Sequence, residues 1–71
     1  MKLRKFLKLV KDADTYFIYD LEGELISVSK EKEDFKNWGN YKVLWCKPSA
    51  NELLIKIEVK NYEGFNPYIK L

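Results

Sequence analysis

The stretch 15–29 constrains the fold of this chain more than any other, because it has the pattern of a β-hairpin. Its first arm is rich in aromatic and β-branched residues. In its second arm, Ile26 and Val28 are predicted to lie on one face. The Asp-Leu-Glu-Gly sequence between the arms has the chemistry of a type I turn. Asp20 can bond the turn backbone, and Gly23 can take a left-handed conformation. The pattern predicts two antiparallel strands, with the acidic side chains of the turn in solvent.

Both faces of the first arm are apolar. Because side chains alternate along a strand, Tyr16 and Ile18 point one way while Phe17 and Tyr19 point the other. One of these pairs therefore faces something other than the helices. Either the C-terminal tail or a second molecule covers that face, and we expect function there.

The opening segment 2–11 has the spacing of an amphipathic helix, with an apolar stripe at Leu3, Phe6, Leu7 and Val10. Another face of this helix is strongly basic, because Arg4, Lys8 and Lys11 recur at helical spacing. Acidic residues dominate the following segment 12–34, so the net charge of +2 is unevenly distributed.

Four interpretations of the basic face stay open: a solvated surface, contact with a nucleic-acid backbone, an acidic protein partner, or an anionic membrane surface. The membrane is the least favoured, because it would use apolar residues that a small core needs. Stacking by Tyr16 or Tyr41 would assist the nucleic-acid interpretation.

The second half predicts another helix followed by two strands. The segment 29–39 has Ser29 as a cap, Phe35 and Trp38 on its buried face, and Gly39 as its stop. A strand at 41–46, a turn at 47–51 containing Pro48 and a strand at 53–60 follow.

The predicted fold is therefore a single small α+β domain over residues 1–71, helix-hairpin-helix-hairpin (αββαββ), with a mainly antiparallel four-stranded sheet. The stretch 61–71 is a tail or contributes a short edge strand at 68–71. The apolar fraction of 46% supports a folded globule rather than a disordered tail.

The composition argues against catalysis and metal binding. The chain has no histidine, and Cys46 is its one cysteine, so neither a Cys-His nucleophile pair nor a structural zinc site can be built. No glycine-rich phosphate loop occurs. We expect a non-enzymatic protein with no cofactor and no metal, located in the cytoplasm and not in a membrane. Cys46 is expected to be a small buried apolar residue.

The candidate partner-binding residues are the basic side chains of the first helix and the aromatic residues that one core cannot easily bury. Of the aromatics, Phe17, Phe35 and Trp45 are expected in the core. The predicted partner-binding set is Arg4, Lys5, Lys8, Lys11, Tyr19, Tyr62, Phe65 and Tyr68.

Three segments of the chain resemble a known group of proteins: the charged opening helix, the sequence Phe-Ile-Tyr-Asp-Leu-Glu-Gly-Glu at 17–24, and the closing strand Leu-Leu-Ile-Lys-Ile-Glu-Val at 53–59. Over residues 1–60 the chain resembles short lysine- and glutamate-rich proteins encoded by prophages and mobile elements of low-GC Gram-positive bacteria. This resemblance implies an inhibitor of host immunity, such as an anti-CRISPR protein, that binds its target without catalysis. No functional residues are carried over, because no motif defines that group.

Three hypotheses follow. The first is a small binding protein, phage- or mobile-element-encoded, that inhibits a host protein or nucleoprotein complex by occupying a surface. The alternative is a nucleic-acid-binding module that uses the basic N-terminal helix. The third is a structural role through homo-oligomerisation, such as a homodimer joined by an edge strand.

Overall fold

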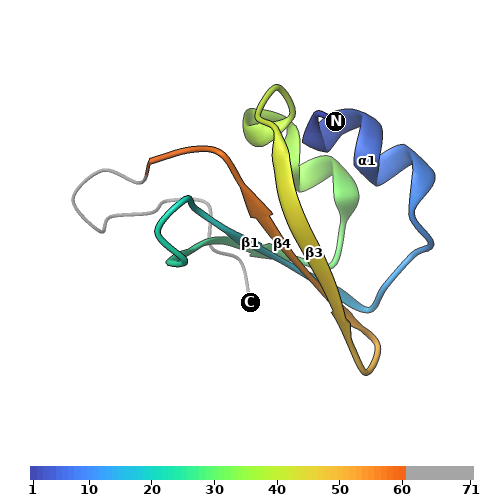
Figure 1. Ribbon diagram of the computed structural model, residues 1–71. Helices are drawn as coiled ribbons and strands as arrows, with labels where there is room; N and C mark the ends of the chain where they lie inside the picture. Colours follow the sequence, from blue (N-terminus) through green and yellow to red (C-terminus); the bar gives the residue numbers. More distant parts are fainter. Residues whose placement is uncertain (61–71) are drawn as a thin grey trace.

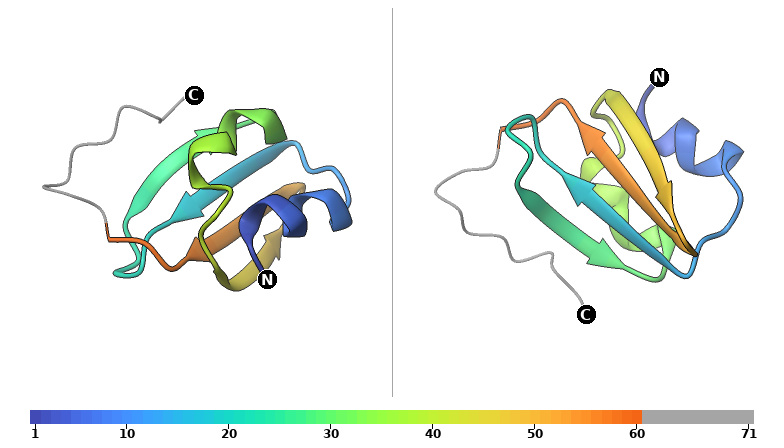
Figure 2. Two further views of the ribbon diagram at one scale, coloured as in Figure 1. Left: turned by 90° about the horizontal axis from the view of Figure 1, so that it is seen from above. Right: turned by 60° about the horizontal axis from the view of Figure 1, so that its bottom comes forward.

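Two short helices lie side by side on one face of a four-stranded sheet (Figures 1 and 2). The computed structural model describes residues 1–60, and the segment 61–71, for which a tail or edge strand was predicted, lies outside the described residues. The elements in chain order are α1 (Leu3–Leu9), β1 (Thr15–Tyr19), β2 (Leu25–Ser29), the 3₁₀ helix η1 (Lys32–Trp38), β3 (Val43–Ser49) and β4 (Glu52–Ile57). The small α+β class is confirmed.

The sheet is mixed, with strand order β2-β1-β4-β3. β1 pairs antiparallel with β2, and β3 pairs antiparallel with β4, but the central pair β1–β4 is parallel. η1 carries the chain from one sheet edge to the other, so β2 and β3 run in the same direction. Their hairpin partners β1 and β4 must then also run in the same direction. Such parallel pairs need a crossover of this kind, which the hairpin patterns alone do not indicate.

The core lies between the sheet and the helices. β1 contributes Tyr16 and Ile18, β4 contributes Ile55 and Ile57, and the other buried members are Leu3, Leu7, Ile26 and Phe35. Tyr16 is fixed twice: its hydroxyl accepts a hydrogen bond from the Ala13 amide at 2.9 Å, and its ring packs edge-on against Phe35 at 5.9 Å between centroids. The helices therefore cover the Tyr16 and Ile18 side of the first arm.

The turn between β1 and β2 forms as the sequence predicts. The Oδ1 atom of Asp20 accepts hydrogen bonds from the amides of Glu22 and Glu24 at 3.0 and 2.8 Å. Gly23 takes a φ of +86°, which a side chain would disfavour. The prediction that the turn acids are all in solvent is wrong for Asp20, whose exposed fraction is 0%. Its carboxylate is held inside the turn because it replaces water as the acceptor for two backbone amides.

A register shift in β2 changes which residues face the core. Ile18 pairs with Ser27 while the next residue of β1, Tyr19, pairs with Leu25, so Ile26 is the extra residue of a bulge. Ile26 packs in the core, whereas Val28 pairs with Phe17 on the opposite face. The prediction that Ile26 and Val28 share a face is therefore wrong.

The helices are shorter and less regular than predicted. α1 ends at Leu9 because Val10 is extended, with ψ of 154°, so Lys11 lies beyond the helix. η1 is a 3₁₀ helix with a kink at Phe35 (φ −100°, ψ 17°). Ser29 stands two residues before the helix cap Glu31, whose amide donates to the Ser29 hydroxyl at 3.1 Å. η1 ends as predicted, with Gly39 at its C-cap, although the φ of −60° and ψ of −28° there are right-handed.

β3 is an edge strand and is largely exposed. It continues through Pro48, where a turn was predicted, because an edge strand tolerates a residue without an amide hydrogen. The predictions that Trp45 and Cys46 are buried are wrong: Trp45 is 43% exposed, and Cys46 is also exposed. Only the start of this strand, at Val43, packs against the core. Phe17, also expected in the core, lies half-buried on the face without helices.

Candidate functional site

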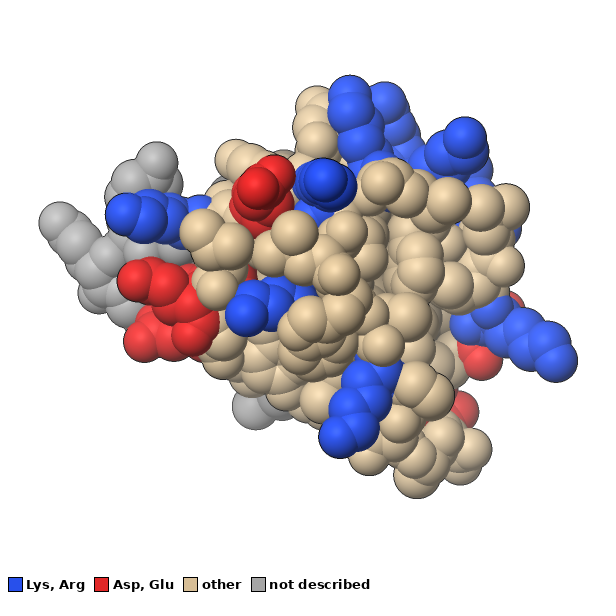
Figure 3. Space-filling model, viewed as in Figure 1, with Lys and Arg blue, Asp and Glu red and all other residues tan. Residues whose placement is uncertain are grey.

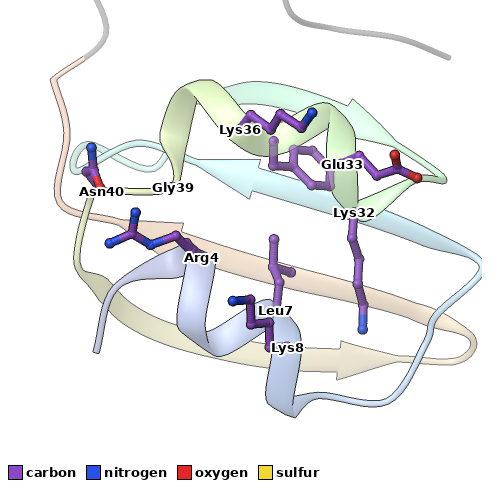
Figure 4. A pocket seen from close by; sticks show the side chains of 9 residues that line it. Arg4, Leu7, Lys8, Lys32, Glu33, Lys36, Gly39 and Asn40 are labelled. Carbon is purple, nitrogen blue, oxygen red and sulfur yellow. The ribbon is translucent and has the colours of Figure 1, made fainter.

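The main hollow of functional interest is a groove between α1 and η1, with a volume of about 580 Å³ (Figure 4). Four of its lining side chains are basic, two from each helix. The complete lining is Arg4, Leu7, Lys8, Lys32, Glu33, Phe35, Lys36, Gly39 and Asn40. The groove exists because the two helices pack on the sheet through their apolar sides and direct their charged sides outward.

The floor of the groove is apolar. Leu7 and Phe35 belong to the core and are 6% and 1% exposed. In Figure 4, the Leu7 side chain points from α1 into the space between the helices. Any ligand that enters the groove therefore meets hydrocarbon at its base and charge only at its rim.

One end of the groove is closed where α1 meets the segment after η1. The Arg4 amide donates to the Gly39 carbonyl oxygen at 3.0 Å, and the Leu3 amide donates to the Tyr41 carbonyl oxygen at 2.8 Å. A Cβ atom at Gly39 would lie 3.3 Å from the Cβ of Arg4, so glycine permits this close approach. The side chain of Arg4 points toward Asn40 across this end (Figure 4).

Lys32 closes the other end. Its Nζ donates to the carbonyl oxygen of Val10 at 3.0 Å and forms an ion pair with Asp12 Oδ1, also at 3.0 Å. The lysine thus ties the start of η1 to the C-terminal end of α1, where the helix leaves carbonyl groups without intrahelical partners. This contact fixes the spacing of the two helices at the second end of the groove.

The rim carries an excess of positive charge. Arg4, Lys8 and Lys36 are exposed, and none of them forms a salt bridge within residues 1–60. The one acid of the lining, Glu33, points away from α1 (Figure 4). Three cations close together without carboxylate partners attract an anionic group, and the apolar floor below them lowers the local dielectric.

The charge asymmetry of the sequence is visible in space. On the face shown in Figure 3, several blue side chains lie at the top and upper right, where Figure 1 places α1, and others are spread over the middle of the face, while the largest group of red side chains lies on the left by the β1–β2 turn. An acidic partner would therefore meet the helical end of the molecule with least repulsion.

The residues of the predicted partner-binding set do not lie together in the structure. Arg4 and Lys8 line the groove, whereas Lys5 is exposed outside its lining and Lys11 lies in the segment after α1. Tyr19 is on the opposite face of the sheet, where it pairs with Lys56. The remaining predicted residues, Tyr62, Phe65 and Tyr68, lie outside the described residues.

Lys32 and Lys36 were not predicted as binding residues, although both line the groove. Their spacing of four residues was a usable signal, since it places two cations on one side of a helix. The acids between and before them, in a segment dominated by negative charge, concealed that signal. The proposed stacking role of Tyr16 is wrong, because Tyr16 is buried. Tyr41 is exposed, and its ring lies 6.0 Å from that of Trp38.

Within residues 1–60, no three side chains of histidine, cysteine, aspartate or glutamate are grouped so that they could hold a metal ion. No helix in the same part of the chain has the length and apolar character needed to span a bilayer. Comparison with protein-family models, with curated proteins and with solved structures finds no match to this chain.

Proposed function

We propose that the protein is a non-enzymatic binding protein that takes an acidic segment of a protein partner into the groove between α1 and η1. The observation that carries this proposal is the combination of an apolar floor with three rim cations that form no salt bridge within residues 1–60. Carboxylates of the partner would pair with Arg4, Lys8 and Lys36, and an apolar side chain between them would contact Leu7. A helix of seven residues is about 10 Å long, so the groove accepts about three residues of extended chain.

The groove favours an acidic protein segment over a nucleic-acid strand. Nucleic-acid modules combine phosphate contacts with aromatic rings that stack on bases. The aromatic residue of this groove, Phe35, is 1% exposed and offers no ring face. The predicted nucleic-acid surface along the N-terminal helix also loses Lys11, because α1 ends at Leu9.

Binding of this kind inhibits a partner by occupying a surface that the partner needs. The resemblance to small prophage proteins supports a host protein or complex as the target, with anti-defence inhibition, of which anti-CRISPR activity is one form, as the biological role. Self-association through an edge strand stays a separate prediction, which light scattering of the purified protein tests.

Charge reversal within the groove tests the proposal. The acidic probe is the acetylated peptide Glu-Glu-Leu-Glu-Glu, and its binding is measured by the changes it causes in the amide chemical shifts of the protein. We expect Lys8→Glu and Lys36→Glu each to abolish this binding. The matched control is Lys5→Glu, which makes the same charge change on α1 outside the groove lining. Capture from bacterial lysates then follows the same pattern: a partner retained by the wild type and by Lys5→Glu is lost with both groove variants.

Two results would contradict the proposal. The first is that the peptide shifts no amides of groove residues, or binds equally when its glutamates are replaced by glutamine. The second is that Lys5→Glu weakens binding as much as Lys8→Glu, which would indicate attraction by net charge alone. Circular dichroism of each variant verifies that the fold is retained.

A further inference from the structure

The face of the sheet without helices carries aromatic rings and lysines in neighbouring positions. Directly paired residues on adjacent strands share a face. The pairing Trp45–Lys56 between β3 and β4, followed by Lys56–Tyr19 between β4 and β1, makes one row across three strands. A second row, Lys47–Leu54–Phe17, lies beside the first. Figure 2 (right) looks onto this face, with η1 behind the strands and α1 seen beyond the β3 edge.

These side chains are accessible at the β3 side of the sheet. Trp45 is 43% exposed, Lys47 is exposed, and Tyr19, Phe17 and Lys56 are half-buried. Neither lysine forms a salt bridge within the described part of the chain. Carboxylates lie at both ends of the two rows: Glu52 pairs with Ser49 and Thr15 in the next row, and Glu58 follows Lys56 by two positions. The two rows therefore combine ring surface with two lysines that form no salt bridge within residues 1–60.

We propose that this face binds single-stranded nucleic acid. Bases stack on aromatic rings with little regard to sequence, and lysines beside the rings neutralise the phosphates that link the bases. β3 and β1 are separated by β4, which places the chains that carry Trp45 and Tyr19 about 10 Å apart. The two rings thus hold different bases of one strand, and Lys56, between them in the same row, contacts the intervening phosphate.

The chemistry of the face selects this occupant over others. A duplex keeps its bases stacked on one another and cannot offer their faces to the rings. A second copy docked on this face would bring its own Lys47 and Lys56 to the same contact, and four lysines gathered in one interface repel each other. A polyanion with exposed ring faces satisfies both the cations and the aromatics. This surface lies on the side of the sheet opposite the groove, so the proposal stands independently of the acidic-peptide site.

Fluorescence anisotropy of labelled ten-nucleotide dT and U oligonucleotides, measured at low salt, tests the proposal. We expect both to bind, and stacking on Trp45 to quench the intrinsic fluorescence. Trp45→Ala should weaken binding by roughly 5- to 150-fold, the range that loss of one stacked base gives. Lys47→Gln and Lys56→Gln should each lower the slope of log K against log salt by about 0.7. Comparison of the two oligonucleotides separates a preference for DNA from one for RNA.

The controls use the other face of the molecule. Tyr41→Ala removes an exposed ring on another part of the surface, and Lys5→Gln removes one charge on α1 outside the groove lining; both should leave oligonucleotide binding within about twofold, well below the loss of one stacked base. The proposal is overturned by absence of binding at low salt, by equal affinity for a duplex of the same length, or by a Trp45→Ala variant that binds as the wild type does. It is also overturned if the wild type is a dimer that Trp45→Ala dissociates and no oligonucleotide binds, because the face is then an interface between copies.

Discussion

A Cβ atom placed on Gly39 would lie 3.3 Å from the Cβ of Arg4 and 3.3 Å from the carbonyl oxygen of Lys36. The backbone there is right-handed, with a φ of −60°, so steric room and not backbone freedom explains the glycine. The close approach lets the Arg4 amide reach the Gly39 carbonyl oxygen and sets the width of the groove at that end.

Substitutions at Gly39 should therefore depend on side-chain size. We expect Gly39→Leu to lower the free energy of unfolding by about 1–3 kcal/mol, the usual effect of overpacking. Gly39→Ala should change it by less than about 1 kcal/mol, because the reduced freedom of the unfolded chain offsets a tight contact. Urea denaturation measures both values. Equal stability of the wild type and Gly39→Leu would show that the helices do not need this close approach.

The buried carboxylate of Asp20 gives a second prediction. Asp20→Ala removes the acceptor of the Glu22 and Glu24 amides and should cost about 1.5–3 kcal/mol of unfolding free energy. Asp20→Asn keeps one oxygen in the position of Oδ1, and its amide group replaces Oδ2, an atom without a hydrogen-bond partner among the described residues. We expect Asn to cost less than about 1 kcal/mol. If both variants lose equal stability in urea, the negative charge itself is required.

The sequence predicted the parts of the fold that depend on neighbouring residues. The hairpin turn is local, since Asp20 bonds amides two and four residues away, and the apolar stripe of α1 follows from helical spacing. The parallel pairing of β1 with β4 depends on a crossover between distant segments, and no short pattern specifies it. The same limit explains the error at Trp45: alternation identified a strand but could not place that strand at the sheet edge.

The sequence predicts only the residues that α1 contributes to the groove. Arg4 and Lys8 came from the periodicity of one helix, but the site also needs Lys36 from η1, which lies beside α1 only in three dimensions. Helical periodicity also predicts Lys11 for the basic face, but α1 ends at Leu9, so Lys11 lies beyond the helix. The residues that convert a basic helix face into a groove thus come from tertiary packing.

Substitutions of Tyr16 separate the contributions of its hydrogen bond and its ring contact to the stability of the core. Tyr16→Phe keeps the ring against Phe35 but loses the hydrogen bond from the Ala13 amide, so we expect a loss of about 0.5–1.5 kcal/mol. Tyr16→Leu also removes the edge-on ring contact, which adds about 0.5–1.5 kcal/mol beyond the lost area. Chemical denaturation of the two variants orders their stabilities. A Leu variant as stable as the Phe variant would argue against a contribution from the ring pair.

Ser29 connects the end of β2 to the start of η1. Its hydroxyl accepts a hydrogen bond from the Glu31 amide at 3.1 Å and donates one to the Asp34 carboxylate. Ser29→Ala removes both contacts, and we expect a loss of about 1–3 kcal/mol, the usual cost of removing one partner of a buried hydrogen bond. Faster hydrogen exchange of the Glu31 amide should accompany that loss and identify its site. Ser49→Ala, at an exposed position of β3, is the matched control and should leave Glu31 exchange unchanged. If Ser29→Ala destabilises the protein without changing Glu31 exchange, the hydroxyl does not stabilise the protein through the Glu31 amide.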